Sequence, residues 1–159
     1  TARSHVPSEA VIQRVLQEVD RLEIERIAIQ WQNDVLGAAP TTDTVVIDGK
    51  QVRGGDLMLV NAVAQPSQRL RGVEPVQSKT NEIPTARTLI DRLNLEGQLV
   101  QLDGMHTQHK TVHQILYEKG ADYSMILRDN QPTLLKTAQT LLPADLPPST
   151  GEDPLTRGT

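Results

Sequence analysis

Apolar residues in the first 40 positions recur at intervals of three and four, which is the spacing of a single helical face. The pattern predicts one helix over residues 7–20, with Ser8 as its N-cap. A second helix follows Asp20 and ends at Gly37. We therefore expect an N-terminal helical segment over residues 1–40.

The pattern changes from helical to strand-like after a small, polar linker. A β-branched run from Val45 to Ile47 predicts a buried strand that ends in the carboxylate of Asp48. Further apolar, β-favouring segments predict a second strand over residues 57–64 and a third over residues 72–77. The turns between them favour three strands that follow one another as a meander.

Helical and strand patterns then alternate along the chain. They predict, in order, a helix over residues 84–97, a strand over 99–102, a helix over 107–119, a strand over 123–127 and a helix over 132–142. Three strands followed by such alternation predict an α/β fold, with a mixed sheet covered by helices on its faces. We expect this core to occupy residues 41–142 and the Pro- and Gly-rich residues 143–159 to be disordered.

Composition narrows the class of protein. The 159 residues are 37% hydrophobic and 23% charged, which fits one globular domain, and no apolar run is long enough for a membrane span. The absence of Cys excludes disulfides, thiolate metal sites and Cys nucleophiles, and it favours a cytoplasmic location. The net charge of −4 gives no overall attraction to nucleic acid. The first residue is Thr1 and not Met, which suggests a start inside a longer reading frame.

Two carboxylates are the main candidates for chemistry. Asp48 and Asp103 each follow an apolar strand and precede a Gly. If the two strands are neighbours, both side chains emerge at one end of the sheet, where α/β proteins place ligand sites. Paired carboxylates suit Mg²⁺ or Mn²⁺, and such ions support phosphodiester chemistry. The alternative interpretation is that each Asp-Gly is simply a turn.

Basic and amide residues beside the first carboxylate are candidates for DNA contacts. Five cations gather between residues 50 and 79, namely Lys50, Arg53, Arg69, Arg71 and Lys79. They predict either a local phosphate-binding surface or a solvated strand face. Lys79, Asn81 and Glu82 precede a predicted helix, so they either cap it or border the site. Asn130 and Gln131 could contact DNA, although a turn before Pro132 favours the same residues.

Histidine and aromatic residues offer weaker hypotheses. His106, His109 and His113 would share one face of a helix and could bind zinc, but the general-base Glu of a His-Glu-x-x-His motif is missing. Surface or half-buried histidines are the favoured interpretation, with His106 nearest Asp103 in sequence. The three aromatic residues, Trp31, Tyr117 and Tyr123, are expected in the core.

Several motifs taken together resemble a known family. They are Ile47-Asp48-Gly49-Lys50-Gln51-Val52-Arg53-Gly54, Ser78-Lys79-Thr80-Asn81-Glu82-Ile83, Leu102-Asp103-Gly104-Met105-His106-Thr107-Gln108, Gly120-Ala121-Asp122-Tyr123 and Leu127-Arg128-Asp129-Asn130-Gln131-Pro132. In this order they resemble the DDE transposases of bacterial insertion sequences, specifically the H-repeat-associated (ISAs-type) group. The likeness runs from about residue 7 to residue 142. It implies a ribonuclease H-like fold, which agrees with the strand order predicted above.

The resemblance implies DNA cleavage and strand transfer at element ends by three carboxylates and a divalent metal, Mg²⁺ or Mn²⁺. Asp48 matches the first carboxylate and Asp103 the second, while Gly104 stands where the family usually has Ala. The family's third acid, a Glu near a His-Gly-Arg motif, has no match, because Glu152 lies among Gly and Pro. The implied protein is a transposase truncated at both ends, and we expect it to be inactive or nearly so.

The implied partners are the DNA of element ends and targets, with a possible homo-oligomer and a nucleoid-associated, cytoplasmic location in bacteria. A rival hypothesis is a non-catalytic DNA-binding or interaction remnant of a decayed element, whose DNA binding would not depend on Mg²⁺. A third hypothesis is a small α/β metal hydrolase that uses the histidines, which stoichiometric zinc would support.

Overall fold

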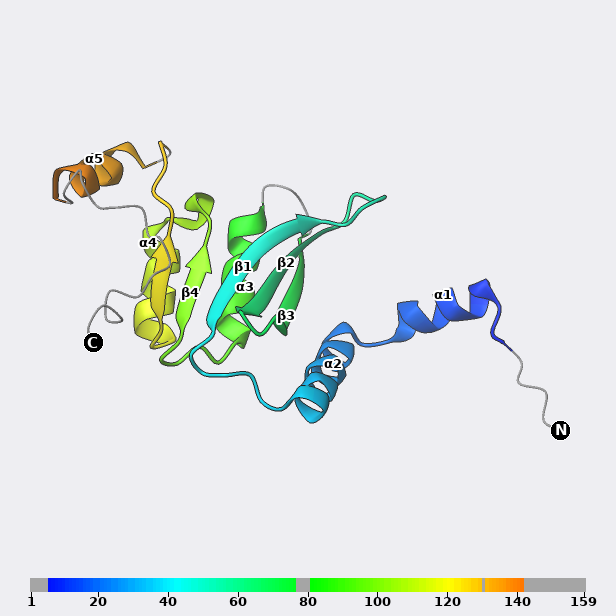
Figure 1. Cartoon of the computed structure of the whole chain (residues 1–159). Coiled ribbons are helices and arrows are strands. Elements are labelled where there is room, and N and C mark those ends of the chain that lie inside the picture. Colours follow the sequence, from blue (N-terminus) through cyan, green and yellow to red (C-terminus); the bar gives the residue numbers. More distant parts are fainter. Residues whose placement is uncertain (1–5, 77–80, 130, 142–159) are drawn as a thin grey trace, which may run out of the picture.

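The computed structural model of the chain describes residues 6–76, 81–129 and 131–141. A five-stranded sheet forms its centre, with helices beside it and helical segments towards both termini (Figure 1). The helices are α1 (Glu9–Glu18), α2 (Arg21–Leu36), α3 (Glu82–Arg92), α4 (His109–His113) and α5 (Pro132–Leu141), together with the 3-10 turn η2 (Gly104–His106) and the π-helical turn η3 (Gln114–Glu118). The strands are β1 (Thr44–Gln51), β2 (Met58–Gln65), β3 (Arg69–Val76), β4 (Leu99–Leu102) and β5 (Asp122–Met125).

The sheet is mixed, as the sequence predicted. Its strand order is β3-β2-β1-β4-β5. β1 pairs with β2, and β2 with β3, in antiparallel fashion, whereas β1 with β4, and β4 with β5, are parallel. The α/β class predicted from the sequence is therefore confirmed, and β1 lies at the centre of the sheet.

The buried core lies on one face of this sheet. Alternate side chains of the central strands point into it, including Val45 and Ile47 of β1 and Val100 of β4. Leu89 and Ile90 of α3 pack against them and are fully buried. Burial of each such side chain contributes about 2 kcal/mol, so this layer supplies much of the stability.

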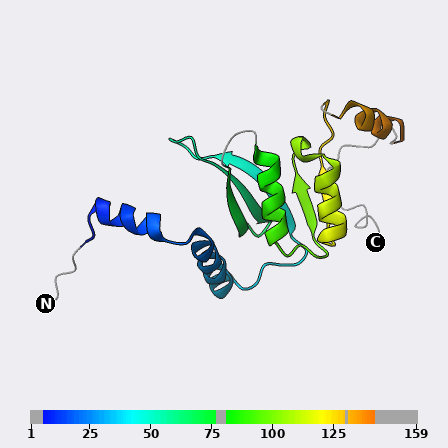
Figure 2. The same ribbon diagram turned by 180° about the vertical axis from the view of Figure 1, so that it is seen from behind.

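Both α3 and α4 with η3 cover the same face, as the two opposite views show (Figures 1 and 2). The expectation of helices on both faces is therefore not met within the described residues. The opposite face carries half-buried side chains such as Val46 and Val63. The reason is topological: both crossovers that link parallel strands, through α3 and through α4 with η3, return on the same side of the sheet.

The long N-terminal helix α2 lies along the outer edge of β3. The side-chain amide of Gln32 accepts from Leu70 N at 2.9 Å and donates to Leu70 O at 3.1 Å, as a neighbouring strand would. Glu25 accepts from Val73 N at 2.7 Å. Buried Arg69 donates to the carbonyl groups of Gln32, Leu36 and Gly37 at the end of α2. These contacts satisfy edge groups that would otherwise be open for pairing.

Several element boundaries and placements differ from the prediction. β1 continues past Asp48 to Gln51 because its pairing with β2 continues to Met58. The predicted aromatic core is wrong: Trp31, Tyr117 and Tyr123 are 64%, 76% and 42% exposed. Trp31 lies on α2 beside the sheet edge, Tyr117 lies on η3, and Tyr123 lies on the edge strand β5, so each element has one side exposed to solvent. Residues 143–159, predicted to be disordered, lie outside the described residues.

Within the described ranges, no helix is both long and apolar enough to span a membrane.

Candidate functional site

The register of the parallel pair brings Asp48 and Asp103 to one end of the sheet. Val46 of β1 is paired with Gln101 of β4, and each of them is followed two positions later by an Asp. Neighbouring strands lie about 5 Å apart, so the backbones of Asp48 and Asp103 are neighbours at this end of the sheet. Asp48 lies within β1 and not at its end as predicted, whereas Asp103 directly follows β4.

Local backbone chemistry holds Asp103. Its Oδ1 accepts a hydrogen bond of 2.9 Å from Met105 N, so Asp103 caps the turn η2. The side chain remains 47% exposed. The carboxylate is therefore anchored through one oxygen and open to solvent, as a ligand for a cation must be.

Asp48 forms an ion pair in this structure. Its Oδ2 contacts the ammonium of Lys50, and both side chains are largely exposed. The hydrogen bond to Asp48 and, next, the carboxylate charge raise the pKa of Lys50 above its ordinary value. Lys50, which was predicted to contact DNA, is therefore paired with Asp48 in this structure.

A third acid and a buried imidazole lie close to Asp103. Glu82 Oε1 is 3.6 Å from His106 Nε2, and the same nitrogen is 4.0 Å from Asp103 Oδ1. Glu82 reaches this position because Gly49 has no side chain, since a Cβ there would lie 2.5 Å from Glu82 Oε1. Glu82 was expected either to cap the helix or to border the site, and its position beside His106 favours the second alternative.

The three histidines do not form one metal-ligating face. His106 lies in η2 and is almost fully buried, whereas His109 and His113 are exposed on α4. The α-helix begins only at His109, which separates His106 from the other two. Across the described residues, no group of three or more His, Cys, Asp and Glu side chains is placed to hold a metal ion.

The other predicted DNA-binding residues are dispersed. Arg53 is exposed in the β1–β2 turn, and Asn81 is exposed at the start of α3, where its side chain makes no capping hydrogen bond. Gln131 Nε2 donates to Thr107 O at 2.9 Å, so it joins the chain before α5 to the residue that follows η2. Lys79 and Asn130 lie outside the described residues.

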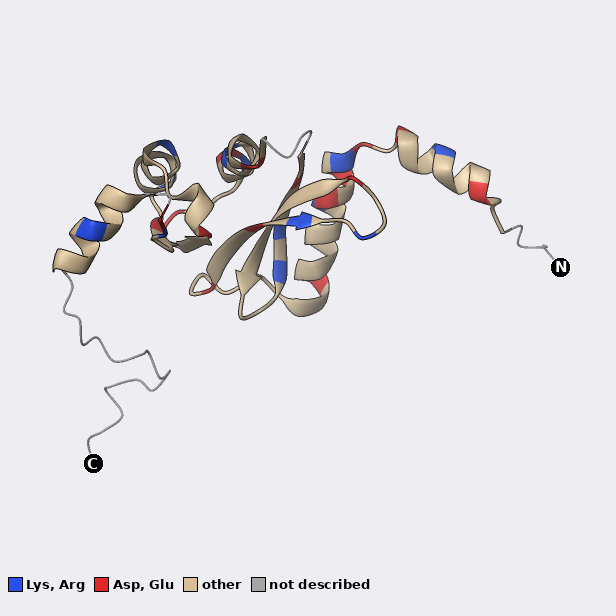
Figure 3. Cartoon of the chain, turned by 90° about the horizontal axis from the view of Figure 1, so that it is seen from above, with Lys and Arg blue, Asp and Glu red and all other residues tan. Residues whose placement is uncertain are grey.

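The predicted basic surface of residues 50–79 does not form as a unit. Arg69 is buried against the end of α2, and Arg71 donates to Asn94 O at 3.0 Å. Both guanidinium groups are used to join elements of the fold. Basic and acidic residues are interspersed along the ribbon (Figure 3).

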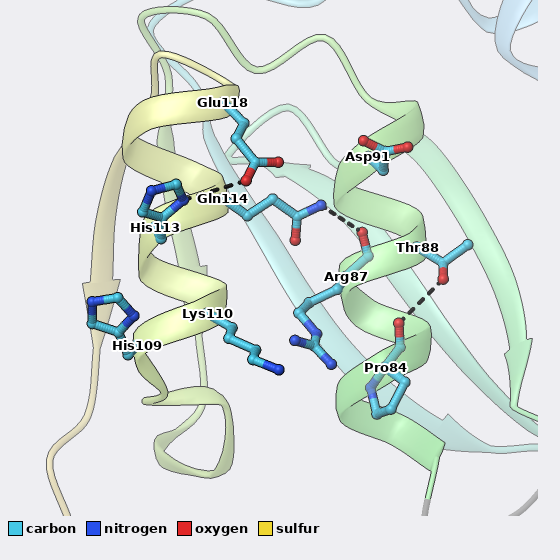
Figure 4. A pocket seen from close by; sticks show the side chains of 9 residues that line it. All are labelled: Pro84, Arg87, Thr88, Asp91, His109, Lys110, His113, Gln114 and Glu118. Atoms are coloured by element: carbon cyan, nitrogen blue, oxygen red, sulfur yellow. Dashed lines mark hydrogen bonds and ion pairs between the residues drawn. The ribbon is translucent and has the colours of Figure 1, made fainter.

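A groove between α3 and α4 presents another pair of cations. It has a volume of about 630 Å³ and begins beside Pro84 and His109, close in sequence to Glu82 and His106. Arg87 and Lys110 extend into it from opposite helices (Figure 4). Neither side chain forms an ion pair with an acid among the described residues. No sequence pattern marks this pair, because the packing of α3 beside α4 brings the two side chains together.

Comparisons with known proteins agree with the motifs. No protein-family model matches the chain. The chain is 27% identical to YncI of Escherichia coli O157:H7 over 89% of this chain and 38% of that protein. It is 26% identical to YncI of strain K12, over 89% of this chain and 59% of the relative. The H repeat-associated protein YbfD of strain K12 is 24% identical over 87% of this chain and 57% of its own length. All three are named as candidate transposases.

The resemblance found in the motifs is confirmed: the chain is similar to proteins named as transposases, H repeat-associated ones among them. The chain spans between 38% and 59% of the length of these relatives.

Proposed function

We propose that the chain carries the metal-binding part of a DDE-type transposase, which cleaves and joins DNA at the ends of an insertion sequence. The observation that carries this proposal is the strand register, by which Asp48 and Asp103 follow the paired residues Val46 and Gln101 at one end of the sheet. The similarity to proteins named as transposases supports it. Phosphodiester chemistry is a common use of two carboxylates in this arrangement.

The same proposal includes a ribonuclease H-like fold. The sheet order β3-β2-β1-β4-β5, with antiparallel first strands and parallel later ones, is compatible with it. In this fold the central strand β1 and its parallel neighbour β4 would supply the first two acids.

The residues at the site fit Mg²⁺ or Mn²⁺. Both ions take oxygen ligands and are commonly held by one or two carboxylates, completed by water and substrate phosphate. Asp48 and Asp103 are about half exposed and so have room for such partners, and the ammonium of Lys50 against Asp48 shows that this carboxylate accepts a cation. Bound there, the ion would supply activation of water or a 3′-hydroxyl and stabilisation of the leaving oxygen.

Two assigned acids limit the activity that we propose for this chain. The family's third acid is assigned to no residue, so a second ion would be poorly held. We therefore propose that the chain by itself cleaves DNA at a low rate or not at all, which makes metal-dependent DNA binding a better test than turnover.

DNA contact would come from cations next to the acids. We include Arg87 and Lys110 in the proposal, because these two like charges lie towards one end of the groove, while its acids Asp91 and Glu118 lie towards the other, and a DNA phosphate would stabilise the pair of cations. Lys50 and Arg53 would contact DNA on the other side of Asp48. The rival hypothesis is a DNA-binding remnant without a metal site, which the same cations would serve equally well.

The test compares the affinity for a labelled DNA duplex in Mg²⁺ and in EDTA, measured by fluorescence anisotropy. We expect Mg²⁺ to strengthen binding by the wild type, because the ion converts repulsion between carboxylates and phosphates into a bridge. Asp48→Asn and Asp103→Asn should lose this dependence. Asp34→Asn, an exposed acid on α2, is the matched control and should keep it.

The double variant Arg87→Gln/Lys110→Gln should bind DNA more weakly with and without Mg²⁺, and its affinity should depend less on salt. The slope of log affinity against log salt should decrease by about 2, one for each lost phosphate contact. If wild type and Asp48→Asn both bind DNA strongly and Mg²⁺ changes neither affinity, the result contradicts the proposal. It would favour the DNA-binding remnant without a metal site.

A further inference from the structure

His106 is a buried polar residue at an exposed site. Its side chain is 2% exposed, and its Nε2 lies between Glu82 Oε1 at 3.6 Å and Asp103 Oδ1 at 4.0 Å. The other ring nitrogen, Nδ1, is buried and has no hydrogen-bond partner among the described residues. Nε2 is the ring nitrogen that faces the two carboxylates, so a proton there has acceptors nearby, whereas a proton on Nδ1 would have none among the described residues.

Glu82 is held near the same ring nitrogen, Nε2. It is the first residue of α3, and its side chain is 13% exposed. The missing side chain of Gly49 leaves room for its carboxylate, and Gly49 directly follows Asp48. Three motifs that are far apart in the sequence, around residues 48–50, 81–83 and 103–107, therefore meet at this point.

We propose that Glu82 and His106 are positioning residues for the metal site, and that the Nε2 proton of His106, 4.0 Å from Asp103 Oδ1 in this structure, closes to hydrogen-bond distance and orients Asp103 when this carboxylate serves as a ligand. This inference rests on the proposed function, in which Asp103 holds the ion. Ligating carboxylates are usually hydrogen-bonded to groups behind them, and such groups fix the ligand's orientation and raise its affinity. Met105 N orients Asp103 from the backbone side, and His106 lies on the side of Glu82.

The arrangement predicts different effects for different substitutions at the same position. His106→Leu fills the buried volume but removes the donor. His106→Gln keeps an N–H donor at a similar reach, so it should preserve most of the positioning. Glu82→Gln keeps the shape of the side chain but removes the negative charge near Nε2 of the ring. A residue that only fills the core would show no difference between the Leu and Gln replacements of His106 in metal affinity.

The experiment measures Mn²⁺ affinity of the full chain by the loss of the free Mn²⁺ paramagnetic resonance signal. Circular dichroism and thermal unfolding without metal establish that each variant is folded. We expect Glu82→Gln and His106→Leu to weaken Mn²⁺ binding about 10-fold, the size typical of groups behind a ligand, and His106→Gln to remain close to wild type. Glu118→Gln and His113→Leu, an exposed His–Glu pair at 3.3 Å, are matched controls and should not change the affinity.

The result also separates this inference from the proposed function. If Asp48→Asn and Asp103→Asn abolish Mn²⁺ binding while Glu82→Gln and His106→Leu bind like wild type, the site stands and the positioning role is overturned. If Glu82→Gln weakens binding but His106→Leu does not, Glu82 acts without the imidazole, and the inference is again overturned. If neither Asp variant changes the Mn²⁺ affinity, the proposed metal site fails and the positioning role fails with it.

Discussion

Lys50 neutralises the carboxylate that is proposed as the first metal ligand. Its ammonium contacts Asp48 Oδ2, and this hydrogen bond raises the pKa of Lys50. The ammonium group is therefore charged throughout the physiological pH range. A divalent ion that binds Asp48 must displace it, so Lys50 competes with the metal and becomes free for a DNA phosphate when the metal is bound.

Replacement of Lys50 tests this competition. In the absence of DNA, Lys50→Gln should raise the affinity for Mn²⁺ about two- to five-fold, the range expected when one exposed ion pair no longer has to be broken. Lys136→Gln on α5 is the control for loss of one positive charge and should have little effect. Equal or weaker Mn²⁺ binding by Lys50→Gln would show that the ion pair does not oppose the metal. Isothermal titration of both variants makes the comparison.

At the residue scale, the sequence pattern indicated where Asp48 and Asp103 lie but not which groups surround them. Asp48 and Asp103 follow apolar strands, and this local pattern was enough to single them out. The contact of Glu82 with His106 depends on how α3 packs, and no local pattern encodes it. The available signal was Gly49, because a glycine inside a strand often marks the close approach of another group. Gly104 is similar: a Cβ there would lie 2.7 Å from Ile126 O, a contact that only the fold reveals.

At the scale of elements, a charged cluster joins α2 to the edge of the sheet. Arg92 of α3 contacts Glu25 at 2.9 Å and Glu74 at 3.0 Å, and Arg21 of α2 also contacts Glu74. Burial acts to raise the pKa of Glu25, but hydrogen bonds from Arg92 and Val73 N and the nearby positive charges outweigh it and lower the pKa. The cluster thus stabilises the docked position of α2 when Glu25 is ionised.

The lowered pKa of Glu25 gives a prediction with a definite sign. The contribution of Glu25 is fully present above the ordinary value of 4.5 and is lost as the pH falls through the lowered value. Glu25→Gln should reduce the free energy of unfolding at pH 7 by about 2 kcal/mol, because it weakens charge-assisted hydrogen bonds in a mostly buried position. Urea unfolding from pH 7 to pH 3 should show wild type and variant converging below pH 4.5.

Glu23→Gln is the comparison on the same helix, because among the described residues Glu23 pairs only with the exposed Arg26 one turn away. It should change stability less than Glu25→Gln. A stability gap between wild type and Glu25→Gln that stays constant down to pH 3 would contradict the role given to the Glu25 charge.

Element types were predictable from periodicity, and element ends and docking were not. The pattern predicted both N-terminal helices and all five strands near their observed positions. The predicted helix over residues 84–97 ends instead at Arg92, where Leu93 and Leu95 become buried in the core beyond the helix. These two leucines continued the apolar spacing of the helix because they pack into the core, although the helix itself has ended. Likewise, nothing in the sequence indicated that the side chains of Gln32 and Glu25 bind the edge of β3.

At the scale of the whole molecule, strand pairing, helix packing and the residues of the groove all bring candidate functional groups to one end of the sheet. The parallel β1–β4 pair places two acids at one end of the sheet. The start of α3 brings Glu82 beside His106 and Asp103, and the cations Arg87 and Lys110 line the groove between α3 and α4. The relatives named as transposases share the same stretch of sequence. The central claim is that Asp48 and Asp103 form one divalent metal site.

Metal-directed cleavage of the chain tests that claim most directly. Fe²⁺ that replaces Mg²⁺ generates hydroxyl radicals with peroxide and ascorbate, and these cut the backbone close to the bound ion. We predict cuts near Asp48 and near residues 103–106 that excess Mg²⁺ suppresses and that are absent from Asp48→Asn. Cuts centred on His109 and His113 instead, or cuts near Asp48 that persist in Asp48→Asn, would contradict it.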